Sequence, residues 1–390
     1  MTEQTEPTGT PTGTAGRRTE PPFRADHVGS LLRPRDLLEA RARHAAGKID
    51  TDALREVEDR SVAEVVALQR DAGLQTATDG ELRRTSWHMD FIYQLEGVDR
   101  AEERLQVHFH NADGDLDFES AALKVHDRVR LGETIFGDAF SFLAETVRQT
   151  APDLTPKLTI PSPSMVHYRG GRAAIDKGVY PELDEFWTDL SAAYAEQLRR
   201  VAELGCTYLQ LDDTSLAYLN DPKQRELVAS QGADAEHQHE QYIRTINAAI
   251  ADRPDSLRVT THMCRGNYRS SWAAEGGYDF VAEALFSELA VDGFFLEYDD
   301  ARSGGFEPLR FVPQGKQVVL GLVTTKRGEL EDKDTLKRRI DEASRFVPLD
   351  QLCLSPQCGF SSTVEGNVLT LEEELAKLRL VVEVAQDVWG

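Results

Sequence analysis

The chain has 390 residues, 40% of them hydrophobic, which is enough for one large domain or two small ones with a sizeable core. Its formal net charge of -23 argues against nucleic acid and anionic membranes as general partners, because both would repel it. Four cysteines are too few for a disulfide scaffold, and we identify neither a secretory signal nor a membrane span, so we expect a cytoplasmic protein.

Residues 1–21 are rich in Thr, Gly, Pro and Glu, which predicts a disordered tail ahead of one domain over residues 22–390. Beyond the tail, short apolar runs alternate with amphipathic stretches of helical period, the clearest being residues 59–73, 189–205 and 371–388. The apolar runs are typical of buried parallel strands and cover residues 24–30, 74–80, 157–163, 207–213, 257–264, 293–300, 317–325 and 351–359. Eight strands alternating with helices predict a single (β/α)8 TIM barrel of the α/β class.

A surplus of sequence lies between residues 85 and 130, beyond the roughly 250 residues that such a barrel needs. Residues 107–120 and 123–131 have the character of strands, and the first stretch contains Gly and Asp residues suited to a tight turn. We therefore expect a β-hairpin excursion after the second strand.

Every predicted strand runs into a polar or reactive cluster at its carboxyl end, where barrel enzymes build their sites. His262 and Cys264 are two positions apart at one strand end, so their side chains point to the same side. Glu297 and Cys358 follow two other strand ends. Zinc accepts imidazole, thiolate and carboxylate ligands, usually four in total, and two thiolates favour zinc over magnesium or calcium. The four residues therefore predict a Zn2+ site.

Several segments, taken together, resemble the catalytic barrel of the cobalamin-independent methionine synthase family. They are VTTHMCRGNY, FFLEYDDARSG and LSPQCGF, with ADHVGSLLRP, TDGELRR and LQLDD earlier in the chain. The resemblance covers nearly the whole chain after the tail. It implies zinc bound by His262, Cys264, Glu297 and Cys358. It also implies that the matching residues Gly29, Ser30, Glu81 and Asp212 hold the amino-acid part of homocysteine.

The expected activity is methyl transfer to a metal-activated thiol, because a thiol is nucleophilic as its thiolate and a coordinating thiol is deprotonated by the metal. By resemblance, the partners are a homocysteine-like thiol and a methyltetrahydrofolate-type donor, and the product is methionine. The family places a catalytic histidine near the end of the seventh strand. Lys326 stands nearest that position here and is the predicted proton donor. With its one barrel, the chain is more similar to the single-barrel branch of the family than to its two-barrel members.

Three alternatives stay open on the sequence. The first two are corrinoid-linked methyl transfer and epoxide:thiol addition, which share the use of a zinc-activated thiol. For epoxide addition, Arg83, Arg84, Arg265 and Lys326 are candidate cations for an acidic thiol tail. The third is a non-catalytic zinc- or thiol-binding barrel, which a closed metal site would favour. The sequence does not determine the oligomeric state, so a homo-oligomer also stays open.

Overall fold

The structure, a computed structural model, describes residues 18–111 and 114–390. Most of the predicted disordered tail, residues 1–17, lies outside the described residues. Residues 18–21 are described, and two contacts tie them to the domain: the Gln75 side-chain amide donates to the Arg18 carbonyl, and Arg258 forms an ion pair with Glu20 at 2.6 Å. Among the described residues, no helix combines the length and the apolar character needed to cross a membrane.

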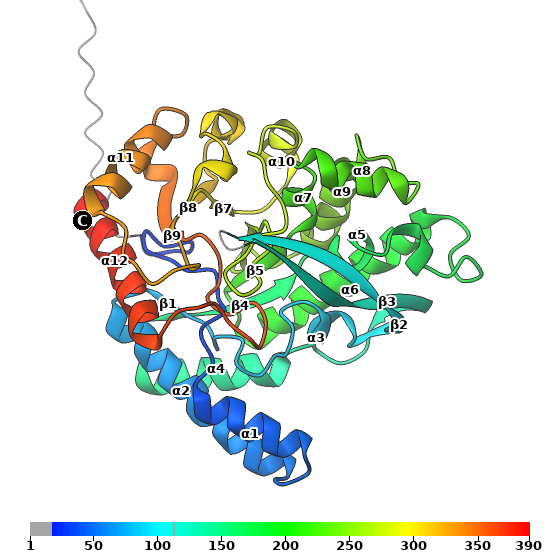
Figure 1. Cartoon of the computed structure of the whole chain (residues 1–390), viewed down its shortest axis with the longest axis horizontal. Helices are drawn as coiled ribbons and strands as arrows, with labels where there is room; N and C mark the ends of the chain where they lie inside the picture. The colour runs from blue at the N-terminus through cyan, green and yellow to red at the C-terminus, as the bar shows by residue number, and fades with distance from the viewer. Residues whose placement is uncertain (1–17, 112–113) are drawn as a thin grey trace, which may run out of the picture.

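A curled parallel sheet confirms the predicted TIM-like barrel of the α/β class (Figure 1). Its strands are ordered β1-β4-β5-β6-β7-β8-β9. Their bounds are β1 (Thr76–Ala77), β4 (Thr155–Pro161), β5 (Tyr208–Asp213), β6 (Arg258–Met263), β7 (Gly293–Glu297), β8 (Gln317–Val323) and β9 (Leu352–Pro356). All neighbouring pairs in this sheet are parallel, so the carboxyl ends of these strands lie at the same end of the barrel.

The first of the eight predicted strands, residues 24–30, is reduced to a single parallel bridge between Ala25 and Leu354 on β9. The side chain of Asp26 takes over the local backbone donors: it accepts from the N–H groups of Phe23 and His27. On its other side, the segment meets the loop after β1, where the Leu31 N–H donates to the Gly80 carbonyl at 3.0 Å. The segment therefore fills the gap between β9 and β1.

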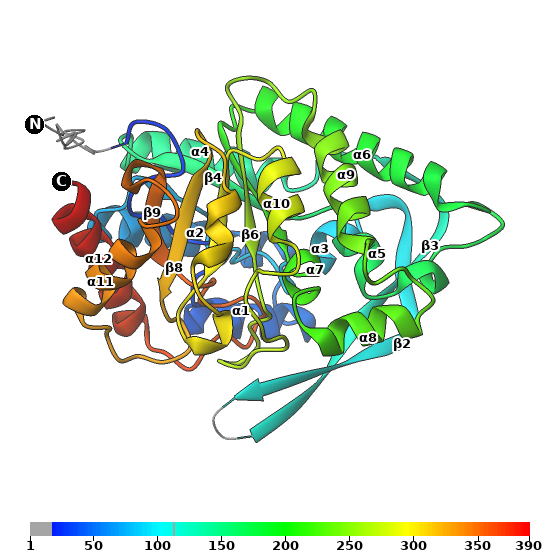
Figure 2. The ribbon, with the colours of Figure 1, turned by 90° about the horizontal axis from the view of Figure 1, so that it is seen from above.

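The helices cover the outside of the sheet, as Figure 2 shows from a second side. The longer ones are α1 (Arg35–Ala45), α2 (Thr51–Ala72), α4 (Gly137–Thr150), α6 (Leu183–Glu203), α8 (Pro222–Ser230), α9 (Gln238–Ile250), α10 (Ala282–Glu288), α11 (Lys333–Ala343) and α12 (Leu371–Trp389). The short ones are α3 (Met89–Ile92), α5 (Met165–Tyr168), α7 (Ser215–Tyr218) and the 3-10 turns η1 (Gly171–Ala174), η2 (Ala301–Ser303), η3 (Glu307–Phe311) and η4 (Leu349–Gln351). Helices α2, α6 and α12 confirm the three stretches predicted from their period.

The predicted hairpin is confirmed as the antiparallel pair β2 (Leu95–Asn111) and β3 (Gly114–Leu131). It is longer than expected, since β2 begins twelve residues before residue 107. In Figure 1 the hairpin lies across the barrel. Two backbone hydrogen bonds between His110 and Trp272, at 2.7 and 2.9 Å, fasten it to the loop after β6.

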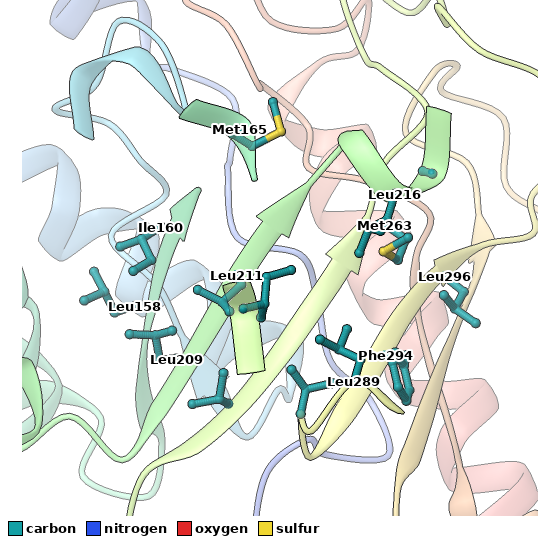
Figure 3. Packing of buried hydrophobic residues seen from close by; sticks show 14 of the residues in the cluster. Leu158, Ile160, Met165, Leu209, Leu211, Leu216, Met263, Leu289, Phe294 and Leu296 are labelled. Carbon is teal, nitrogen blue, oxygen red and sulfur yellow. The ribbon is translucent and has the colours of Figure 1, made fainter. Parts of the chain in front are cut away.

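Strand alternation divides the sheet residues between an apolar outer layer and a mostly polar interior. Figure 3 shows the outer set on β4, β5, β6 and β7: Leu158, Ile160, Leu209, Leu211, Met263, Phe294 and Leu296 belong to the main hydrophobic core. The residues that alternate with them along the strands face inward. They include Lys157, whose ammonium lies 3.4 Å from Asp26, and Gln210, which donates to Asp212. The barrel interior therefore contains buried polar side chains that are available to a ligand at the carboxyl ends of the strands.

Candidate metal centre

The four predicted metal ligands meet at the carboxyl end of the barrel. One ligand atom from each of His262, Cys264, Glu297 and Cys358 lies within 4.8 Å of the others, and all four residues are buried. His262 is the penultimate residue of β6 and Cys264 follows the end of that strand, Glu297 ends β7, and Cys358 follows β9. The Sγ atoms of the two cysteines are 3.4 Å apart. Chain segments almost one hundred residues apart therefore converge on one point.

The donor atoms fit a zinc ion. Both ring nitrogens of His262 and the Oε2 atom of Glu297 are buried, with no hydrogen-bond partner among the described residues. Leaving buried polar atoms without a partner costs free energy, so these unpaired ligand atoms indicate a cation-binding site. The hydrogen bond between the cysteines lowers the pKa of the Cys358 thiol well below its usual value and raises that of Cys264. Of the two thiols, Cys358 is therefore the more readily deprotonated.

Arg265 and Tyr278 hold Glu297 in place beneath the cluster. The Arg265 N–H donates to Glu297 Oε1 at 3.2 Å, and the fully buried Arg265 guanidinium donates to the Glu297 carbonyl and to the Tyr278 hydroxyl. The Tyr278 oxygen in turn accepts from the Glu297 N–H at 2.9 Å. Burial raises the pKa of Glu297, while the positive charge of Lys326 lowers it. Supporting groups of this kind orient metal ligands.

The predicted substrate residues Ser30, Glu81 and Asp212 line the same cavity as His262, Cys264 and Cys358. Its volume is about 250 Å³, and we call it the metal-side cavity. Glu81 accepts from the Thr159 hydroxyl at 2.7 Å through Oε1, while its Oε2 has no partner among the described residues. Burial, and then the negative charge of Glu81, raise the pKa of Asp212 to about 7. Two buried carboxyl groups side by side suit a ligand ammonium.

Two glycines allow the cavity floor to pack closely. A Cβ on Gly29, whose φ is +148°, would lie 2.6 Å from Thr159 Cγ2 and close to Glu81. A Cβ on Gly359 would lie only 1.9 Å from the Ser30 hydroxyl. Larger residues at either position would therefore displace the side chains that line the cavity. Gly29 supports the predicted site through this close approach and is not itself part of the cavity lining.

Lys326, the predicted proton donor, lies beyond the end of β8, with its Nζ atom 3.3 Å from Asp299 Oδ2. It does not line the metal-side cavity. Its role as an acid stays a prediction. The other candidate cations for an acidic thiol tail also form ion pairs within the protein. Arg83 pairs with Glu58 and Asp59, Arg84 pairs with Glu81, and Arg265 pairs with Glu297.

Aromatic side chains form part of the wall of the metal-side cavity. Trp87 and His88 line the cavity, whereas the nearby Phe91 packs on Phe136 and Tyr194 in the core. The hairpin adds Phe109 and Phe118, whose rings lie 5.5 and 4.4 Å from Tyr268. These contacts join segments about 150 residues apart, so no local sequence signal reveals them.

Comparison with known proteins places these features in a family. The family model described as the catalytic domain of cobalamin-independent synthase matches residues 149–387. Over 384 residues the chain is 48% identical to the uncharacterized protein YxjH of Bacillus subtilis, covering 97% of this chain and 99% of that protein. It is 25% identical over 337 residues to the methionine synthase of Pyrococcus abyssi, covering 85% and 84%.

Among solved structures, the chain is similar to a Listeria monocytogenes protein assigned as a vitamin-B12-independent methionine synthase. The identity is 37% and the TM-score is 0.76, with coverage of 96% of this chain and 100% of that one. The match to the family model spans more than half of the sequence and includes the four residues of the metal centre. The chain therefore belongs to the cobalamin-independent synthase catalytic-domain family.

Proposed function

We propose that this protein is a zinc-dependent S-methyltransferase that moves a methyl group from a methyltetrahydrofolate-type donor to homocysteine, giving methionine. The observation that carries the proposal is the shared cavity. Two sulfurs and one imidazole of the four-residue cluster line it together with Ser30, Glu81 and Asp212. One small pocket therefore offers a thiol-activating centre and a site for an amino-acid ammonium group.

Glu81 and Asp212 would bind the ammonium of the amino acid, and Ser30 lies beside them for its carboxylate. Gln210 keeps Asp212 in place by donating to Oδ1 at 2.6 Å, and Thr159 does the same for Glu81. With its charged end fixed, the side chain of homocysteine points its sulfur toward Cys264 and Cys358. Fixing the reacting atom in this way replaces a random encounter with an oriented one.

Zinc, when bound by His262, Cys264, Glu297 and Cys358, would lower the pKa of a thiol that reaches it and keep that thiol nucleophilic. Glu297 is the carboxylate of the set, and the Arg265 guanidinium lies 4.0 Å from its Oε2 atom, ready to neutralise its charge. In the reaction, the thiolate sulfur forms a bond to the methyl carbon, the bond from that carbon to the donor nitrogen breaks, and the nitrogen gains a proton. The aromatic wall of Trp87, Phe109 and Phe118 excludes water from this exchange.

The test is to replace Cys358 by Ser and to measure both bound zinc and transfer of a labelled methyl group from 5-methyltetrahydrofolate to homocysteine. We expect the wild-type protein to hold one zinc ion per chain. The variant should lose the metal and lose activity by more than the roughly 10–100-fold that removal of an outer-shell partner costs.

Cys353→Ser is the matched control, because Cys353 is a buried thiol on β9 five residues earlier and lies outside the metal cluster. It should keep zinc and activity. Full methyl transfer by a zinc-free Cys358→Ser protein would overturn the proposed mechanism.

A further inference from the structure

A second cavity, of about 630 Å³, lies beside the metal-side cavity, and we call it the side cavity. Its walls come from β2, the end of α5, helix α8 and the loop after β6, and include Gln106, Val107, Tyr168, Gln224, Leu227, Val228 and Ala273. Hydrogen bonds join these walls: the Tyr168 hydroxyl donates to Gln224, and the Gln224 amide donates to the Ala273 carbonyl. The volume is in the range of about 300–1,000 Å³ that sites for drug-sized ligands occupy.

Tyr218 and Arg169 line both cavities and so form the boundary between them. Tyr218 ends the short helix α7, which Asp213 fixes by accepting from the Ser215 hydroxyl and the Leu216 N–H. The Tyr218 ring packs edge-on against Tyr168, with their centroids 5.6 Å apart. The boundary is therefore held by the strand end that also carries Asp212.

The Tyr218 hydroxyl is an unpaired donor at this boundary. The residue is 2% exposed, and its oxygen has no hydrogen-bond partner among the described residues. Burial raises its pKa, so the group stays protonated and able to donate at physiological pH. The hydroxyl comes so close to Gly266 that a Cβ there would lie 2.5 Å from it. A buried hydroxyl of this kind is costly unless a ligand atom accepts from it.

Arg169 is an unpaired cation at the same boundary. Its Nε atom is buried without a hydrogen-bond partner, and no acidic side chain lies within ion-pair distance among the described residues. The acidic residues that line the side cavity accept hydrogen bonds from other groups. Asp221 accepts from the N–H groups of Lys223 and Glu275, and Glu275 accepts from the Trp272 indole. In a chain with 67 acidic and 44 basic residues, an arginine without an acid is suited to an anionic ligand.

We propose that the side cavity binds the body of the methyl donor, with a donor carboxylate at the Arg169 guanidinium and a hydrogen-bond acceptor of the donor at the Tyr218 hydroxyl. The inference rests on the proposed function, because it assigns one substrate of that reaction to a place. The donor's methyl-bearing end lies in the metal-side cavity, beyond Tyr218. Because Tyr218 and Arg169 line both cavities, a single carboxylate-bearing donor of the folate type can extend from one cavity into the other.

The test is equilibrium binding to the zinc-loaded full chain by calorimetry, without homocysteine. The two probes are 5-methyltetrahydrofolate and the amide of 5-methyltetrahydropteroate, in which an NH2 group replaces the glutamate so that no carboxylate remains. Arg169→Gln should weaken binding of the folate about tenfold or more and change binding of the pteroate amide less than about twofold. Arg169→Lys should restore part of the loss, and Tyr218→Phe should weaken both probes.

Arg244→Gln is the control for the loss of one positive charge, since Arg244 is exposed on α9 and should leave both affinities unchanged. Equal affinities of wild type and Arg169→Gln for the folate would overturn the assignment, as would equal losses for both probes. Binding that depends on Arg169 without any methyl transfer would overturn the proposed function alone. Methyl transfer with binding that ignores Arg169 would overturn the side-cavity assignment alone.

Discussion

In the proposed amino-acid pocket, Asp212 is the residue whose ionisation would most directly control ligand binding. It is buried at the end of β5, and burial together with the charge of Glu81 raises its pKa to about 7. It has no ion-pair partner among the described residues, so near neutral pH it exchanges between the acid and the carboxylate. Only the carboxylate attracts an ammonium group, and protons therefore compete with the amino acid for this position.

Binding of L-methionine should weaken as the pH falls below about 7, by up to about tenfold for each unit, and should level off above pH 7. Methionine is a suitable probe because it carries the ammonium and carboxylate of homocysteine but no ionisable thiol. The dissociation constant is measured by calorimetry between pH 5.5 and 8.5 on zinc-loaded protein. In Asp212→Asn the affinity should be lower and nearly independent of pH, whereas a flat profile in the wild type would contradict the role of Asp212.

At the level of secondary-structure elements, the β2–β3 hairpin has a base and a tip with different roles. A register shift between Arg100 and Arg104 separates them. The base buries Val98, Val125 and Val129 in the main core, whereas the tip brings Phe109 and Phe118 to the metal-side cavity. The base therefore stabilises the fold, and the tip covers the site.

Replacing the tip, residues 104–121, by a two-residue Asn-Gly turn should leave the barrel folded and impair the use of the donor. We expect the KM for 5-methyltetrahydrofolate to rise roughly tenfold, because an aromatic wall that buries apolar ligand surface is removed. Far-UV circular dichroism and steady-state kinetics check the two parts of this expectation. Loss of the folded structure would show that the tip is structural, and an unchanged KM would show that it does not contact the donor.

At the scale of the whole molecule, the two ends of the chain close the barrel against each other. The N-terminal segment bridges β9, and the Leu32 N–H donates to Glu374 Oε1 on α12 at 3.0 Å, across 342 residues of sequence. Glu374 is 1% exposed, and burial raises its pKa from 4.5 to about 8. This closing contact therefore uses a carboxyl group that prefers to be neutral.

Glu374→Gln should remove the loss of folding stability that ionisation of this buried carboxyl group causes at high pH. A carboxyl group with a raised pKa in the folded state stabilises the fold below about pH 4.5, and this stability is lost as the pH rises toward 8. The variant keeps an acceptor for Leu32 but cannot ionise. Its free energy of unfolding in urea should exceed that of the wild type by about 4 kcal/mol at pH 8 and by about 1 kcal/mol at pH 5. Equal pH dependence of the two proteins would contradict this account.

The sequence by itself determined the features that depend on local order. Their spacing of two residues placed His262 and Cys264 on the same side of one strand end, and the 3.6-residue period located α2, α6 and α12. The polar clusters after the strands marked the end of the barrel where the site lies. These signals are local because strand alternation and helix period are properties of neighbouring residues.

Only the tertiary structure decided how the site is completed. It reduced the first predicted strand to one bridge, because Asp26 satisfies the backbone there, and it placed the buried Arg265 beneath Glu297. It also brought the hairpin tip to Tyr268 and set Tyr218 and Arg169 between two cavities. Each of these results depends on contacts between distant segments, whose energies arise only when the barrel has closed.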